Sequence, residues 1–284
     1  MGVEVDPNAI FDVQVKRLHE YKRQTLKLLH ILKLYQDLKA GIDHPKRVAI
    51  FGAKAAPSYV FAKQVIKVIN ETANMINSDP DINGKLKVIF LENYDVSLAE
   101  KIIPAADVSE QISTTTKEAS GTSNMKLIAN GALTVATMDG ANIEIADAVG
   151  EDNIITFGLN KDQVYKYYAE HSYHPREMYE SDPVMKKTVD ALTDGTIPNC
   201  FSEGQALANK FLSDNEQFFV LADFADYLKA QEKVEQEWKD KHSWAQMSLV
   251  NIAHSERFDV DKTIERYAQD IWHFKKLKVE KVDH

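Results

Sequence analysis

Short, strongly apolar runs, each preceded by an amphipathic helix, are the feature of this sequence that most constrains its fold. Residues 47–51 and 86–91 are almost wholly apolar, as expected of strands buried on both faces of a parallel sheet. Apolar residues recur at helical spacing before each run, over residues 15–40 and 58–76. Gly41 and the turn at residues 79–84 end these helices. Alternating helices and strands with short connections predict an α/β domain with a doubly wound parallel sheet.

The alternation continues toward the carboxyl end. We expect a short helix capped by Ser97 and stopped by Pro104, a helix over residues 121–130 and a strand over residues 133–137. Weaker strand signals lie at residues 143–145 and 153–157. Beyond about residue 162 the spacing predicts mainly helices, at residues 184–192, 203–212, 218–238, 244–255 and 262–274, the last opened by an acidic cap at Val260-Asp261.

Composition excludes several classes of protein. The chain has 284 residues, of which 44% are hydrophobic and 27% charged, which excludes disordered and collagen-like proteins. No apolar run approaches the ~20 residues that a membrane-spanning helix needs, and the first residues lack the features of a secretory signal. Cys200 is the only cysteine, so no internal disulfide can form and a reducing compartment is expected. We therefore expect a cytoplasmic protein without membrane contacts.

The net charge of −9 argues against a nucleic-acid partner. An acidic protein that binds anions must concentrate its cations locally, and the sequence has one such concentration. It consists of five residues within twelve positions: Lys16, Arg17, Lys22, Arg23 and Lys27. Two interpretations are open, a solvated helix face and a local anion site.

The densest candidate chemistry lies at residues 118–126, EASGTSNMK. Small residues there let the backbone approach a ligand closely, and amides at a helix start favour a phosphate. Lys126 lies within the first turns of the predicted helix, where a lysine beside an anion site suits condensation with a carbonyl. The alternative is a glycine turn before a helix that carries a surface lysine. The spacing matches neither an NTPase phosphate loop nor a dinucleotide fingerprint.

Four blocks of the sequence closely resemble the α-glucan (glycogen, starch and maltodextrin) phosphorylase family and occur in that family's order. They are FDVQVKRLHEYKRQ at 11–24, GAKAAP at 52–57, FLENY with SLAEKIIPAAD at 90–107, and EASGTSNMK at 118–126 with NGAL and MDGAN after it. The resemblance runs from about residue 3 to 274. It implies a Rossmann-like fold, the second domain of a two-domain GT-B-type glycosyltransferase, over residues 1–255. Residues 256–284 would form a terminal helix that crosses to an amino-terminal domain.

The resemblance also implies a cofactor and its ligands. Lys126 would hold pyridoxal 5′-phosphate as a Schiff base, while Lys16 and the backbone of Thr122 would hold its phosphate. Gln111 and Tyr94 match positions that line the cofactor ring. The cofactor's phosphate, rather than its aldehyde, would take part in catalysis by exchanging a proton with inorganic phosphate.

The implied reaction is reversible phosphorolysis, in which an α-1,4-glucan and inorganic phosphate give α-glucose 1-phosphate with retained configuration. Arg17 and Lys22 would be the catalytic residues that hold the substrate phosphate. Four residues match positions that hydrogen-bond the glucosyl hydroxyls: Tyr21, Glu118, Ser120 and Gly121. Glu118 would thus bind sugar, whereas glycosidases place two carboxylates across the bond. The full-length protein is expected to be a homodimer, and no metal ion is implied.

Two departures from the family pattern concern the cofactor. Asp95 stands where relatives often carry a basic residue, which puts one cofactor contact in question, and Ser123 replaces a glycine. Family members are also far longer, because an amino-terminal domain forms the other wall of their cleft. We therefore expect the isolated chain to lack activity. Its last helix should either fold elsewhere or expose its apolar residues, namely Ile264, Tyr267, Ile271 and Trp272.

Two alternative functions remain open, a nucleotide-sugar glycosyltransferase domain and a non-catalytic domain that binds the cofactor or glucan. The first shares the architecture but needs no Schiff-base lysine. Five tyrosines between residues 165 and 179 could form a carbohydrate-stacking platform, but a half-buried helix face is the simpler interpretation. His19 and His30 lack the spacing and the carboxylate company of metal ligands.

Overall fold

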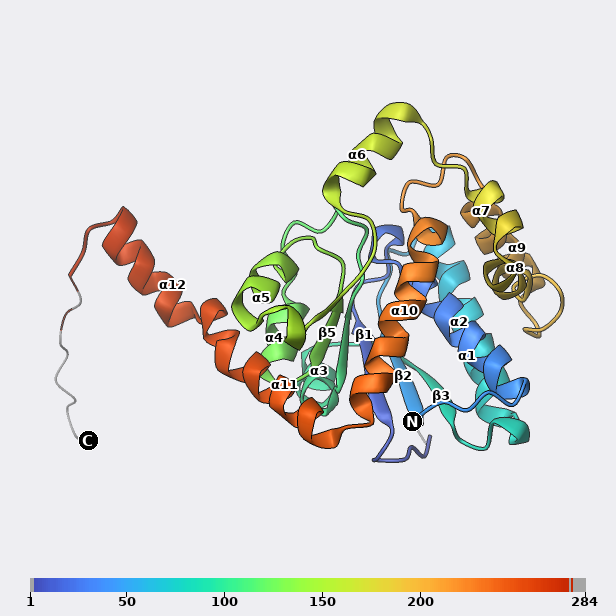
Figure 1. Cartoon of the computed structure of the whole chain (residues 1–284), viewed down its shortest axis with the longest axis horizontal. Coiled ribbons are helices and arrows are strands. Elements are labelled where there is room, and N and C mark those ends of the chain that lie inside the picture. The colour runs from blue at the N-terminus through green and yellow to red at the C-terminus, as the bar shows by residue number, and fades with distance from the viewer. Residues whose placement is uncertain (1–2, 276, 278–284) are drawn as a thin grey trace.

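A parallel, six-stranded sheet forms the centre of the protein, in a computed structural model that describes residues 3–275 and 277 (Figure 1). Its strand order is β3-β2-β1-β4-β5-β6, with every neighbouring pair parallel. The strands are β1 (Ile10–Val15), β2 (Arg47–Gly52), β3 (Leu86–Leu91), β4 (Val108–Gln111), β5 (Leu133–Ala136) and β6 (Ile155–Thr156). The order reverses direction between β1 and β4, so the predicted doubly wound sheet is confirmed.

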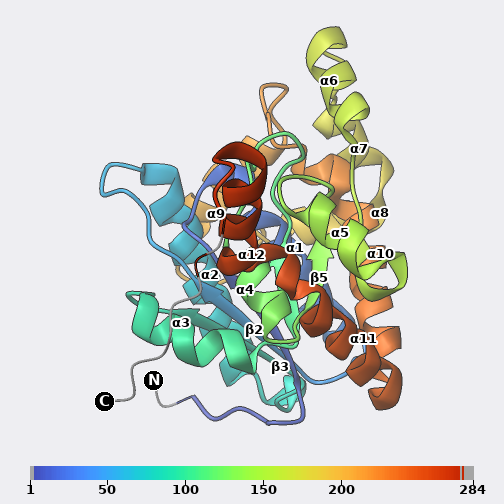
Figure 2. The same cartoon turned by 90° about the vertical axis from the view of Figure 1, so that its left-hand side faces the viewer.

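Helices cover both faces of this sheet (Figures 1 and 2). One layer contains α1 (Gln24–Lys39), α2 (Val60–Ser78), α7 (Pro175–Ser181), α8 (Pro183–Asp190), α9 (Phe201–Phe211) and α10 (Val220–Trp238). The other layer contains α3 (Val96–Ile102), α4 (Ser123–Ala129), α5 (Asn142–Val149) and α11 (Lys241–His254). Helix α6 (Lys161–Glu170) stands at one end of the sheet, and α12 (Val260–Arg266) continues into a π-helical segment at Tyr267–Ile271.

Both faces of the sheet pack against helices, which is why β2 and β3 are continuous apolar runs in the sequence. On β2, Ala49 and Phe51 join the larger core beneath α1, α2 and α10, whereas Val48 and Ile50 join a smaller core beneath α3 and α4. Successive side chains of a strand point to opposite faces, so burial on both faces requires apolar residues at every position.

Strands β1 and β4 were not predicted, because both carry buried polar residues. Asp12 of β1 accepts hydrogen bonds from Lys27 Nζ at 2.8 Å and from Arg47 Nη1 at 2.9 Å. Glu110 of β4 accepts one from Gln231 Nε2 at 2.6 Å. All five side chains are buried. A buried charge needs a partner, and these partners come from elements far apart in the sequence.

The predicted helix over residues 15–40 is in fact the end of a strand, a 3-10 turn at Glu20–Lys22 and α1. Arg23 separates the turn from the helix with a left-handed backbone, φ 55°. Its buried guanidinium forms an ion pair with Asp223 at 2.6 Å and donates to the carbonyl of Ile112 at 2.8 Å. A solvated helix face is therefore the wrong interpretation for Arg23 and Lys27, which are core residues.

Three local predictions were also wrong. Residues 143–145 belong to helix α5, not to a strand. The cap of α3 is Asp95, whose Oδ1 accepts from Leu98 N at 3.0 Å, rather than Ser97. The last helix is capped by Asp259. An Asp carboxylate one or two residues earlier in the chain satisfies the orphan amides of the first turn as well as the predicted residue would.

Helix α12 stands away from the rest of the structure in Figure 1. Of the two outcomes expected for this region, exposure is observed: Ile264 of α12 and Tyr267, Ile271 and Trp272 after it are 46%, 44%, 61% and 48% accessible. The proposed division at residues 255 and 256 remains a prediction, and part of the second unit lies outside the described residues. Within the described part, no helix is both long and apolar enough to cross a membrane.

Candidate active site

The candidate active site is a cavity of about 760 Å³ at the carboxyl ends of the central strands. In doubly wound sheets, ligands bind where the strand order reverses, here between β1 and β4. Lys16 and Arg17 follow directly after β1, and Lys54 follows β2. The cavity brings together nine of the residues singled out in the sequence: Lys16, Arg17, Tyr21, Lys22, Tyr94, Glu118, Ser120, Gly121 and Thr122.

Three charged side chains form the centre of this cavity. Glu118 Oε2 lies 2.6 Å from Lys22 Nζ and 3.7 Å from Lys16 Nζ, and it accepts a hydrogen bond from Ser113 Oγ at 3.0 Å. With Arg17 and Lys54 also lining the cavity, four cations face one carboxylate. The site therefore has excess positive charge and suits an anionic ligand.

The environments of the two lysines shift their pKa values in opposite directions. Burial lowers the pKa of Lys16 to about 8, with Glu118 opposing and Lys22 adding to the effect. Burial also disfavours the charged form of Lys22, but its hydrogen bonds outweigh this and raise the pKa of Lys22. Burial would raise the pKa of Glu118, but Lys22, Lys16 and Ser113 together lower it, so Glu118 is ionised at neutral pH.

The segment that carries Glu118, Ser120 and Gly121 is held by the loop after β5. Asp139 Oδ2 accepts hydrogen bonds from the backbone N–H of Glu118 at 2.8 Å and of Lys117 at 3.0 Å. The Ala141 N–H donates to the Ser120 carbonyl at 2.8 Å. A Cβ at Gly140 would lie 2.6 Å from that same carbonyl oxygen, so only glycine lets the two segments approach so closely.

Asn142, the first residue of α5, fixes the start of α4. Its Oδ1 accepts from Asn124 Nδ2 at 3.0 Å, while its own Nδ2 donates to the carbonyls of Gln111 and Thr137 at 3.2 and 3.0 Å. Gly121 has φ +87°, a left-handed conformation that other residues adopt only with strain. The small-residue segment is therefore rigidly placed along one wall of the cavity.

Of the two residues expected to line the cofactor ring, Tyr94 lines the cavity and Gln111 does not. The ring of Tyr94 lines the cavity and packs on Gly52, where a Cβ would meet it at 3.1 Å. Gln111 lies buried at the end of β4, behind Ser123, to whose Oγ it donates at 3.4 Å. Its Oε1 has no hydrogen-bond partner within the described residues. Asp95, the departure noted beside Tyr94, points its carboxylate at the first turn of α3.

Lys126 does not line the cavity. Its side chain is exposed, and it lies in α4 three residues after Ser123, which does line it. Residues three apart share a helix face, so Lys126 lies one turn beyond the cavity wall. The expected helix at residues 121–130 is observed as α4.

Three functional candidates were missed in the sequence. Lys54 is the fourth cation of the cavity, and Asp139 and Asn142 place its wall through backbone and amide contacts. Each lies within a block that carries the family resemblance, which was the available signal. The described residues contain no cluster of three or more potential metal ligands.

The fold and the site define a doubly wound α/β domain with a cation-lined cavity at its switch point. The profile of the carbohydrate phosphorylase family matches residues 1–274. The chain belongs to this family.

Relatives named glycogen phosphorylase agree with this assignment. That of Bacillus subtilis (strain 168) is 50% identical over 278 residues, which is 97% of this chain and 35% of the relative. The protein of Synechocystis sp. is 46% identical over 98% of this chain and 33% of its own length. The human liver form is 47% identical over 95% of this chain and 32% of its own length. The chain thus spans about a third of the length of these relatives.

Proposed function

We propose that this chain is the cofactor-carrying part of a pyridoxal phosphate-dependent α-1,4-glucan phosphorylase, a glycosyltransferase. The observation that carries the proposal is the cavity in which Lys16, Arg17, Lys22 and Lys54 surround Glu118. Two phosphates brought to hydrogen-bonding distance repel strongly in a site with little water, so several fixed cations must surround them. The names of the relatives support glycogen or a similar glucan as the substrate.

The residues of the cavity fit pyridoxal 5′-phosphate. The Tyr94 ring offers a flat wall, and Lys16 and the Thr122 backbone lie along the same cavity, where they would hold the phosphate. Gln111, with its unpartnered buried Oε1, would lie on the ring side. When bound, the group supplies a phosphate that exchanges a proton with inorganic phosphate.

Lys126 would hold the cofactor through its amine. Its position one turn beyond Ser123 and the exposure of its side chain leave the amine room to turn toward the cavity. No ion pair within the described residues holds it elsewhere.

The other cavity residues would bind substrate. Arg17 and Lys22 would hold inorganic phosphate, since both cations line the cavity beside Lys16. Glu118 is ionised, so it can accept hydrogen bonds from sugar hydroxyls but has no proton to donate as an acid. Tyr21, Ser120 and Gly121 would complete the glucosyl site.

The reaction is reversible phosphorolysis of the terminal glucosyl unit, which leaves as α-glucose 1-phosphate with retained configuration. This places the enzyme in glycogen or maltodextrin metabolism. We expect the complete protein to be a cytoplasmic homodimer. The buried, single Cys200 is consistent with a reducing compartment.

The chain alone would not complete the reaction. It covers about a third of its relatives' length, and the exposed apolar residues of α12 need a cover that the remaining two thirds would supply. We therefore propose that residues 256–284 dock on an amino-terminal domain. Purified alone, the chain should release no glucose 1-phosphate, and co-expression with the rest of a phosphorylase should restore release.

The decisive test is cofactor attachment. The chain is incubated with pyridoxal 5′-phosphate, reduced with borohydride, digested and analysed by mass spectrometry. We expect a pyridoxyl group on Lys126, and none after Lys126→Ala. The variant Lys101→Ala, which changes an exposed lysine outside the cavity, is the matched control and should label normally. Labelling elsewhere, or no labelling, would support the nucleotide-sugar glycosyltransferase instead.

A further inference from the structure

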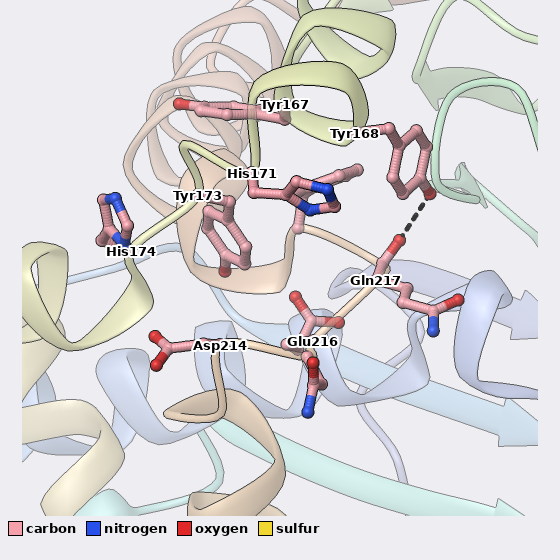
Figure 3. Close-up of a pocket in the computed structure, with 10 residues that line it drawn as sticks. Tyr167, Tyr168, His171, Tyr173, His174, Asp214, Glu216 and Gln217 are labelled. Carbon is pink, nitrogen blue, oxygen red and sulfur yellow. Dashed lines mark hydrogen bonds between the residues drawn. The ribbon is translucent and has the colours of Figure 1, made fainter.

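A second cavity, of about 490 Å³, lies outside the candidate active site (Figure 3). It is bounded by α6, the segment at residues 171–174 and the loop at residues 214–217, and it shares no lining residue with the first cavity. Its volume lies within the range of ~300–1,000 Å³ that small-molecule sites occupy. Nothing in the proposed phosphorolysis uses it.

One side of this pocket is built from packed aromatic rings. Tyr167 stacks on Phe219 with ring centroids 5.4 Å apart and planes inclined by 25°. Tyr173 meets the same Phe219 edge-on at 5.1 Å. Tyr168 closes another part of the wall, because its hydroxyl donates to the Gln217 carbonyl at 2.8 Å (Figure 3). The aromatic wall is therefore fixed from both α6 and the loop.

The other side of the pocket is polar. Tyr173 is only 5% exposed, and its hydroxyl has no hydrogen-bond partner within the described residues. That hydroxyl points toward the loop that carries Asp214 and Glu216 (Figure 3). A buried hydroxyl without a partner is unfavourable, so this group is poised to meet a ligand atom.

Further polar groups surround the opening. His174, Asp214 and Gln217 also line the pocket, and their side chains make no hydrogen bond within the described residues. The Glu216 carboxylate is already engaged, because it accepts from the N–H groups of Phe218 at 2.7 Å and Val220 at 3.2 Å. The available groups therefore include donors and acceptors, and they do not form a purely acidic site.

The pocket has a flat aromatic wall on one side and carboxylate, amide and imidazole groups on the other. This combination matches a sugar ring, because the C–H face of a sugar packs on aromatic rings and its hydroxyls both donate and accept hydrogen bonds. A bound cation would be balanced by Asp214 alone, because the other carboxylate of the pocket, Glu216, already accepts two backbone hydrogen bonds. We propose that this pocket binds a sugar unit of an α-1,4-glucan at a distance from the catalytic cavity. The choice of glucan rests on the proposed function.

The test is isothermal titration calorimetry of the chain with maltoheptaose, with cellohexaose as the β-linked control. We expect Tyr173→Phe, which keeps the ring and removes the hydroxyl, to weaken binding about five-fold. Tyr167→Ala should weaken it about ten-fold. Tyr165→Ala, on the same helix but outside the pocket, is the matched control and should bind normally.

Three outcomes would overturn the proposal: no maltoheptaose binding, binding unaffected by both pocket variants, or displacement of maltoheptaose by tetramethylammonium. Binding that is lost in Glu118→Ala but unaffected by both pocket variants would assign the sugar to the catalytic cavity, which removes the second site and leaves the proposed function intact. Conversely, failure of pyridoxyl labelling at Lys126 with pocket binding preserved would remove the proposed function and leave the sugar site standing.

Discussion

Replacing Lys16 by Met should stabilise the folded chain at neutral pH, although it removes a residue that we assign to phosphate binding. Burial lowers the pKa of Lys16 from 10.5 to about 8, so the folded state holds its proton less tightly than the unfolded state does. At about 1.4 kcal/mol per pKa unit, the charged lysine costs on the order of 3 kcal/mol below pH 8. Methionine has a similar shape and carries no charge, so it avoids this cost.

The pH dependence supplies the sharper check. Between pH 8 and 10.5 the unfolded state binds more protons than the folded state, so the free energy of unfolding of the wild type increases as the pH rises. The difference in free energy of unfolding between Lys16→Met and the wild type should therefore shrink over this range. Urea unfolding followed by circular dichroism measures the difference in free energy of unfolding between the two proteins at pH 7 and at pH 10. Lys54→Met, at an exposed cation of the same cavity, is the matched control and should leave the free energy of unfolding at pH 7 unchanged, because an exposed charge carries no burial cost. A Lys16→Met chain that is less stable at pH 7, or a gap independent of pH, would refute the reasoning.

Three further predictions follow from other parts of the structure. Asp223→Ala should lower the free energy of unfolding by about 3–5 kcal/mol, because it leaves the buried Arg23 unpaired; Asp81→Ala, which breaks an exposed pair with Lys39, should leave the urea midpoint unchanged. Gly140→Ala should displace the Ser120 carbonyl and thereby weaken the binding of pyridoxal phosphate, which absorbance measures. The circular dichroism spectrum of the variant should remain that of the wild type, and undiminished cofactor binding would contradict the reasoning. Burial raises the pKa of Cys200 to about 11, so at pH 8 a thiol reagent should react only after unfolding in urea, and rapid reaction of the native chain would be the contrary result.

The fold class could be predicted because β2, β3 and β5 are apolar on both faces. Strands β1 and β4 could not be predicted from periodicity, since Asp12 and Glu110 resemble surface residues until their partners are known. These two strands flank the switch point. Periodicity alone therefore gave the architecture without the position of the site, which came from the family resemblance.

The candidate site was predictable in its residues but not in their environments. Lys22 and Arg23 are adjacent and carry the same charge, yet one lines the cavity and the other is buried. Nothing local distinguishes them, because the partner of Arg23 lies 200 residues away. The exposure of Lys126 could not be predicted either, because it depends on how the first turn of α4 lies relative to the cavity wall.

The long separation between Arg23 and Asp223 has a consequence for how the protein is made. During translation Arg23 emerges 200 residues before its partner Asp223 in α10. Until then the guanidinium must remain hydrated, and the turn at Glu20–Lys22 cannot settle against its neighbours. The segment around Arg23 thus matures only after α10 has been made, and a nascent chain arrested before α10 would have no competent anion site.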